Sequence, residues 1–119
     1  MRNLLAMAIP ILPGKTAQWT KFVYELKTTR YNDFTESRRK LNVRERTFLQ
    51  KTPQGDFVII TLEGQNPQAA FENFGKTNNE FTKWFMAQVK EIHGVDLTAP
   101  PPGPLPEMLI DSLEEVYHL

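Results

Sequence analysis

The stretch from Val43 to Gly64, VRERTFLQKTPQGDFVIITLEG, most constrains what this chain can fold into. It holds two runs rich in β-branched and aromatic residues, separated by Pro53-Gln54-Gly55. Proline presets φ for a tight turn, and glycine accepts the positive φ that such turns require, so the stretch is predicted to be a β-hairpin. The second strand is apolar on both faces, which indicates a central strand, whereas the charged first strand is expected at an edge.

The register of this hairpin follows from its turn. Pairing the strands about the turn sets Lys51 opposite Asp56, and successive side chains then alternate between two faces. One face carries only Glu45 as a charged residue and suits burial beneath helices; its members are Val43, Glu45, Thr47, Leu49, Val58, Ile60 and Leu62. On the other face Arg44 is opposite Glu63, Arg46 is opposite Thr61, and Phe48 lies beside Ile59.

The residues before the hairpin predict one more strand and a helix. The run from Asn3 to Ile11 is apolar on both faces, as expected of a buried strand. From Thr16 the hydrophobic period lengthens to that of an amphipathic helix. The helical stripe contains Trp19, Phe22, Val23 and Leu26, and it can be followed through Arg30, Phe34 and Leu41. We therefore expect the helix to continue or restart before Asn42.

The residues after the hairpin predict two helices and a final strand. Asn66-Pro67 is a helix-start signal, and the segment from Thr77 to Glu80 has capping-box spacing. Gly94 is the expected stop of the second helix. The proline-rich residues between Val95 and Pro106 are expected to form an extended spacer. The spacer would carry the chain to a last edge strand, from Glu107 to Leu113.

This element order predicts an α+β, ferredoxin-like βαββαβ fold with a four-stranded antiparallel sheet in the order 4-1-3-2. A single domain would cover residues 1–113, and residues 114–119 would form a C-terminal tail. Helices cover one face of such a sheet. The other face needs an apolar cover, and it carries either Leu4, Ala6 and Ala8 or Leu5, Met7 and Ile9. We therefore predict a homodimer that joins through the open sheet face.

Composition limits the possible partners. The chain has 14 lysines and arginines against 14 aspartates and glutamates, so it has no net field to attract nucleic acid or an anionic membrane. The absence of cysteine excludes disulfides and thiolate metal sites. Ala6-Met7-Ala8 mimics a signal-peptide cleavage site, but only Leu4 and Leu5 precede it as an apolar run. We expect a cytoplasmic protein with neither nucleic-acid nor membrane partners.

Two short motifs carry a resemblance to a known family. They are ILPGK, from Ile11 to Lys15, and FVIITLEGQNPQAAFENF, from Phe57 to Phe74, and the aromatic Phe81 also fits. Over residues 3–113 the chain resembles the dimeric α/β-barrel superfamily, within it the small antibiotic biosynthesis monooxygenase type proteins and their uncharacterised relatives. That superfamily includes cofactor-free oxygenases, haem-degrading enzymes, small-molecule lyases and members with no known activity. The haem-degrading relatives use a histidine early in the last long helix, where this chain has FTKWF, so haem ligation is not expected.

The polar residues of the hairpin are the candidate ligand site. Arg44 and Arg46 beside Glu63 could bind and polarise a carboxylate or enolate in a cavity. The alternative is an edge-strand ion pair that discourages aggregation. Thr61 and Trp84 complete the candidate ligand-binding residues; catalytic residues are not identified, and no cofactor is expected.

Other polar residues favour structural interpretations. His93 stands one residue before Gly94 and is expected to interact with the helix dipole. His118 lies in the tail, and the two histidines lack the spacing of a metal site. The basic run from Ser37 to Lys40 is interpreted as a solvated helix end.

Two functional hypotheses follow. The first is small-molecule binding or cofactor-independent, monooxygenase-like chemistry; the alternative is a non-catalytic dimeric structural or interaction module. An enzyme would place Arg44, Arg46 and Glu63 around an open cavity. A structural module would fill that space with Phe48, Ile59 and Met7.

Overall fold

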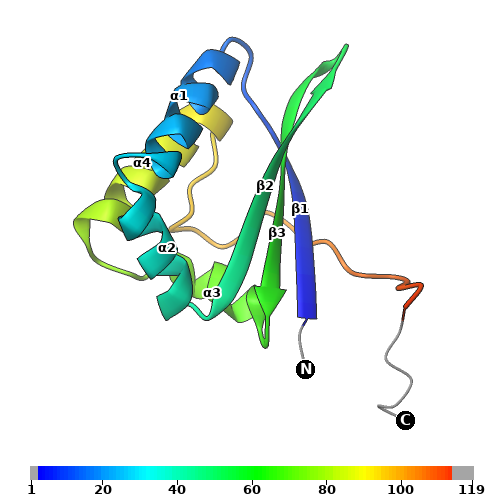
Figure 1. The fold of residues 1–119 in the computed structure, drawn as a ribbon. Helices are drawn as coiled ribbons and strands as arrows, with labels where there is room; N and C mark the ends of the chain where they lie inside the picture. Colours follow the sequence, from blue (N-terminus) through cyan, green and yellow to red (C-terminus); the bar gives the residue numbers. More distant parts are fainter. Residues whose placement is uncertain (1–2, 114–119) are drawn as a thin grey trace.

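The computed structural model describes residues 3–113 and shows an α+β fold with seven elements (Figure 1). The predicted C-terminal tail, residues 114–119, and His118 within it lie outside the described residues. In chain order the elements are β1 (Asn3–Pro10), α1 (Thr16–Lys27), α2 (Tyr31–Lys40), β2 (Val43–Thr52), β3 (Gly55–Gly64), α3 (Pro67–Phe74) and α4 (Glu80–His93). The three strands form one antiparallel sheet in the order β1-β3-β2.

The predicted four-stranded ferredoxin-like βαββαβ fold, with the dimeric α/β barrel built on it, is wrong. The chain has the order β-α-α-β-β-α-α, and residues 107–113 form no strand. Proline lacks an amide hydrogen and cannot donate to a sheet ladder. Prolines 100, 101, 102, 104 and 106 precede this segment, which runs away from the sheet (Figure 1). As a result β1, expected at the centre, is an edge strand.

The hairpin prediction is confirmed in detail. Lys51 is paired with Asp56, Arg46 with Thr61 and Arg44 with Glu63. Gly55 at the turn has a φ of 137°, a value that favours glycine. β3 lies between the two other strands, as its apolar character on both faces predicts.

The helices lie on one side of the sheet (Figure 1), and the core fills the space between the two layers. Phe22 and Phe74 each pack edge-on against Phe85, with ring centroids 5.2 and 5.3 Å apart. Such edge-to-face pairs are the preferred arrangement of buried aromatic rings. Sheet residues that meet this core include Val58, which is 1% exposed. The predicted stripe of α1 is therefore the core face of that helix.

A second, smaller cluster shows which face of β1 points toward the helices. Leu5 and Met7 are buried with Leu62, and Ile9 packs against them. Leu4, Ala6 and Ala8 are exposed on the opposite face. Of the two alternatives that the sequence allows, the structure thus selects Leu4, Ala6 and Ala8 as the uncovered apolar set.

The helix ends agree with the sequence except at one position. The Asn66 side chain accepts a hydrogen bond from the amide of Ala69, and Gly94 ends α4 in the left-handed region. α4 is capped by Asn79, whose side chain accepts from the amide of Thr82 at 2.8 Å, and not by Thr77 as predicted. Asparagine is at least as good an N-cap as threonine, so a start at Asn79 does not make the helix less stable.

Candidate functional site

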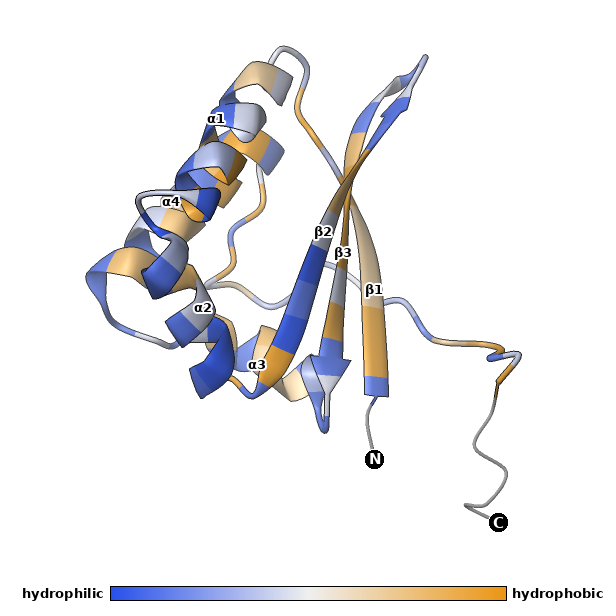
Figure 2. Cartoon of the chain, viewed as in Figure 1, coloured by the Kyte–Doolittle hydropathy of each residue, from blue (hydrophilic) through white to orange (hydrophobic). Residues whose placement is uncertain are grey.

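The candidate site is the sheet face that no described helix covers, here called the open face. Side chains alternate along each strand, so its members follow from the pairing of the strands. They are Leu4, Ala6, Ala8 and Pro10 from β1, Phe57, Ile59, Thr61 and Glu63 from β3, and Arg44, Arg46, Phe48 and Gln50 from β2. The open face is mainly apolar, and its charged residues gather at one end of β2 and β3. Figure 2 shows this contrast between apolar β1 and the hydrophilic half of β2.

Small side chains lie together in the middle of the open face. Ala6 is paired with Thr61, which is paired in turn with Arg46, and these three residues form one row across the sheet. The adjacent row begins with Ala8. Larger apolar side chains surround this centre, and two of them are substantially exposed: Leu4 at 43% and Phe48 at 52%.

An ion pair connects the charged residues of the open face. Nη1 of Arg46 donates to Oε1 of Glu63 at 3.2 Å, although the residue directly opposite Glu63 is Arg44. The side chains of Arg46 and Glu63 are 39% and 28% exposed. A half-exposed pair of this kind remains accessible to an approaching anion, and its own contribution to stability is small. The predicted register of this cluster is confirmed, and its role as a ligand site stays a prediction.

Thr61 is the polar residue at the centre of the open face. Its hydroxyl oxygen is buried and has no hydrogen-bond partner within residues 3–113. A buried hydroxyl without a partner costs about 1–3 kcal/mol. A ligand on this face could reach the hydroxyl only after a neighbouring side chain moves aside.

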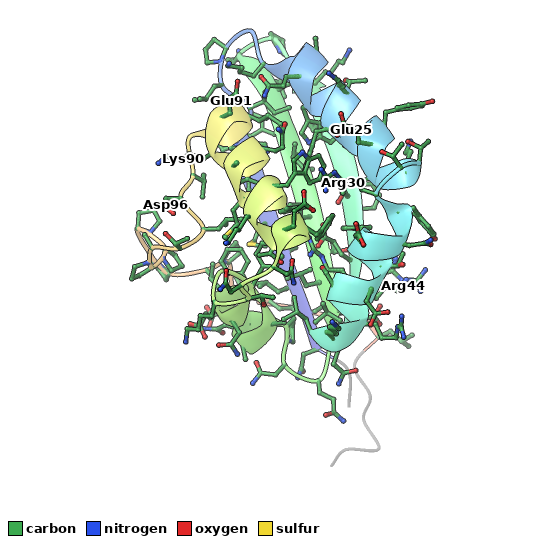
Figure 3. All side chains as sticks on the ribbon, turned by 90° about the vertical axis from the view of Figure 1, so that its left-hand side faces the viewer. Glu25, Arg30, Arg44, Lys90, Glu91 and Asp96 are labelled. Carbon is green, nitrogen blue, oxygen red and sulfur yellow. The ribbon has the colours of Figure 1, made fainter. Side chains whose placement is uncertain are left out.

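Trp84 lies apart from the other four candidate residues. It belongs to α4 in the helix layer, where its ring packs against Phe22 and Phe81. The guanidinium of Arg30 stands 4.0 Å from the centre of the Trp84 ring and also pairs with Glu80 at 3.2 Å. Figure 3 shows Arg30 between α4 and α1, and Arg44 beside the lower end of α2. Trp84 is thus held as part of the core and cannot contact the same small molecule as Arg46.

A buried arginine is the main polar feature that the sequence did not predict. Nε of Arg38 donates to Glu45 at 2.7 Å, and both side chains are less than a tenth exposed. The Arg38 guanidinium also lies 4.7–4.8 Å from the ring centres of Phe34, Phe74 and Phe85. The interpretation of residues 37–40 as a solvated helix end is therefore wrong for Arg38, although Arg39 and Lys40 are exposed. Glu45 is the single charged residue on the buried face of β2, and this was the sequence feature that could have indicated a buried cationic partner.

Arg38 also borders an open hollow between α2 and the start of β2. The hollow has a volume of about 540 Å³, and Arg39, Arg44 and the backbone around Gly64 contribute to its wall. Arg39 pairs with Glu36, and Arg38 pairs with Glu45, so two of its three cations are neutralised within the protein. This hollow therefore offers an external anion less charge than its arginine content suggests.

His93 ties α4 to the end of β1. Its Nδ1 lies 2.8 Å from the carbonyl oxygen of Pro10, and the side chain is nearly buried. Burial lowers the pKa of His93 below its ordinary value of 6.5, and the bond to Pro10 opposes this shift in part. The neutral ring therefore donates to Pro10, in place of the charged interaction with the helix dipole that the sequence suggested.

Residues 3–113 contain neither a candidate metal site nor a membrane-spanning helix. No group of three or more histidines, aspartates and glutamates is arranged there to hold a metal ion. None of the helices in this range has the length and apolar character needed to cross a membrane.

Comparisons of the chain with protein-family models, curated proteins and solved structures find no match. The resemblance to the antibiotic biosynthesis monooxygenase type proteins therefore stays a prediction.

Proposed function

We propose that this chain works as a homodimer that binds a small organic anion between the open faces of its two copies. The observation that supports this proposal is the arrangement on the open face. A centre of small residues, Ala6, Ala8 and Thr61, lies directly beside the Arg46–Glu63 ion pair on an otherwise apolar sheet surface.

The apolar character of the open face favours a second copy as its cover. A sheet with helices on one side ordinarily hides its other apolar face against another layer. Leu4 and Phe48 are about half exposed in the single chain, so both would gain burial on association. The net charge of zero also removes a general repulsion between copies. A twofold axis through the open face would cover both copies with the same surface.

The small side chains favour a cavity within that dimer. Facing sheets stand about 10 Å apart, and the gap is normally filled by interdigitating side chains. Alanines at positions 6 and 8 cannot fill their share of this gap. Met7, the larger side chain between these two alanines, is buried on the helix side of the sheet and does not enter the gap. Phe48 and Ile59 would close only one end of the space.

The polar residues suggest the charge of the ligand. A guanidinium binds carboxylates with directional, charge-assisted hydrogen bonds. Arg46 can present donors to such a group while Glu63 holds the guanidinium in position. An organic carboxylate with an apolar body matches the arrangement of both kinds of residue.

The described open face favours binding over catalysis. Its twelve members include no histidine, and its carboxylate, Glu63, is engaged with Arg46. A general base needs a group that is ready to accept a proton near neutral pH. Cofactor-independent oxygenase chemistry therefore stays a prediction. The location in the cytoplasm is a separate prediction.

Calorimetric titration with a panel of carboxylates led by benzoate tests the proposal. Benzamide and benzylamine serve as neutral and cationic controls. We expect a carboxylate to bind the dimer, and Arg46→Gln to weaken binding by about tenfold or more. Ala8→Leu should also weaken binding by filling the cavity, whereas Arg39→Gln on α2 should not.

If no carboxylate in the panel binds a confirmed dimer, the binding proposal is wrong, and the alternative of a non-catalytic dimeric module is favoured. A carboxylate that binds Arg46→Gln as tightly as the wild type would show that its binding site is not the open face.

A further inference from the structure

The segment from Glu107 to Leu113, here called the C-terminal arm, contains four of the ten exposed large hydrophobic side chains among the described residues. Leu109, Ile110 and Leu113 are 85%, 88% and 84% exposed, and Met108 is 51% exposed. Soluble proteins rarely leave four large apolar side chains of one short segment in water. Figure 2 shows apolar residues on this segment after it has left the sheet.

The chain is anchored up to the point where the arm begins. Leu97 packs against the aromatic core, and Leu105 packs against the small cluster of Leu5, Met7 and Leu62. Beyond Pro106 the arm passes the edge of the sheet at β1 and projects on the side of the open face (Figure 1). That is the side on which the proposed second copy would lie.

The edge of β1 is an open sheet edge to which the arm could add as a strand. Among residues 3–113, β1 pairs only with β3, and no backbone hydrogen bond joins it to residues 99–113. An apolar edge strand with unpaired backbone groups is a template for another strand. The charged edge of β2 is protected against such pairing by Arg44, Arg46 and Lys51, whereas β1 has no charged residue between Leu4 and Pro10.

We propose that the arm of each copy pairs with β1 of the second copy, as an exchanged strand that locks the dimer. This inference rests on the proposed homodimer, because it places a partner beside the open face. Seven residues of extended chain span roughly 23 Å, which suits the eight residues of β1. Reciprocal exchange of identical segments is a common way for a dimer to gain stability.

The sequence of the arm suits an added strand. Alternate side chains would place Met108 and Ile110 on one face and Leu109 and Leu113 on the other, so both faces carry apolar residues. β1 is likewise apolar on both faces, so the neighbouring side chains would match. The prolines that end at Pro106 favour an extended approach to the arm, and in Figure 1 the arm runs away from the β1 of its own chain.

A photo-crosslinking experiment distinguishes exchange from its alternatives. Full-length chain with p-benzoylphenylalanine in place of Leu109 is prepared in unlabelled and in ¹⁵N-labelled form. The two preparations are mixed while unfolded and are then refolded together. We expect crosslinks between residue 109 and peptides of β1 that join a labelled to an unlabelled chain. Tyr24, which is 65% exposed on α1, is the control position and should yield no such link.

A second variant measures the contribution of the arm. The double substitution of Leu109→Ser with Ile110→Ser should weaken dimerisation by at least about tenfold, because two large apolar contacts are lost. Tyr24→Ser should leave the dimer dissociation constant unchanged.

The outcomes separate this inference from the proposed function. A dimer with links only within one chain, or with an unchanged dissociation constant in the double variant, would overturn arm exchange and leave the homodimer standing. A monomeric chain would overturn both. Links from residue 109 to a partner surface other than β1 would also contradict the exchange.

Discussion

Arg38 and Glu45 form a buried ion pair, with Nε and Oε1 2.7 Å apart, that joins α2 to β2. The guanidinium is surrounded by aromatic rings from α2, α3 and α4, so a single side chain connects most of the helix layer to the sheet. Breaking a buried pair leaves an uncompensated charge, which is far more costly than losing an exposed pair.

We therefore expect Glu45→Gln to lower the free energy of unfolding by about 3 kcal/mol. The matched control is Glu36→Gln, which removes the exposed partner of Arg39 and should cost less than about 1 kcal/mol. Urea unfolding of the two variants gives the comparison. Equal losses would show that the Arg38–Glu45 pair is not buried in the protein.

His93 makes the stability of the fold depend on pH. Its pKa is lowered by burial, so the unfolded chain binds a proton more readily than the folded one. Stability is then fully present above the unfolded pKa of 6.5 and is lost as pH falls toward the lower pKa of the folded state. A variant that lacks the imidazole isolates this contribution.

His93→Asn supplies that variant, because asparagine can still donate to the carbonyl of Pro10 but does not titrate. We expect the unfolding free energy of the wild type to fall more steeply than that of His93→Asn between about pH 7 and pH 5. Parallel pH profiles for the two proteins would contradict the assignment of a buried, neutral His93.

Gly75 fixes the path of the chain that leaves α4. A Cβ added at Gly75 would collide with the carbonyl oxygen of Leu97, whereas one added at Gly103 would meet nothing within 4 Å. Neither glycine has a positive φ, so the two substitutions to alanine differ mainly in this collision.

We expect Gly75→Ala to destabilise the protein by about 1–3 kcal/mol, because backbone at Leu97 has to move. Gly103→Ala should leave stability nearly unchanged. Thermal unfolding followed by circular dichroism measures both, and a stable Gly75→Ala protein would show that residues 95–98 do not pack against α3.

Shortening the proline-rich spacer tests the same path from its other end. Deleting three residues between Ala99 and Pro106 should lower thermal stability, because Leu105 could no longer reach the cluster of Leu5 and Met7. An unchanged melting temperature would indicate that the spacer does not hold Leu105 in place.

A charge on the open face should prevent association. Ala8→Asp places a carboxylate at the centre of the proposed interface, where burying it without a partner is unfavourable. We expect loss of the dimer together with lower thermal stability. Gln54→Asp at the exposed hairpin turn is the control and should have neither effect. A fully dimeric Ala8→Asp protein would exclude the open face as the interface.

Much of the fold could be predicted because local patterns determine it. The two-residue period and the turn together set the pairing of Arg46 with Thr61, and helix caps such as Asn66 act over three residues. The choice between the two faces of β1 could not be predicted, because Leu5 and Leu4 are equally apolar in the sequence. Only the position of the aromatic core distinguishes them.

The errors arise where tertiary contacts override the local pattern. Arg38 belongs to a basic run that is typical of a solvated surface, but its buried partner Glu45 lies on another element. The segment from Glu107 to Leu113 was expected to be a strand, yet it forms none, although the edge of β1 is open. Trp84 was grouped with the candidate ligand residues by type, whereas its helix places it in the core.

The native mass of the full chain tests the central claim most directly. Light scattering at micromolar concentration should give twice the 13.8 kDa mass of the single chain, in agreement with a dimer through the open face. A well-folded species at the mass of one chain would contradict the homodimer, and with it the shared binding cavity and the exchanged arm.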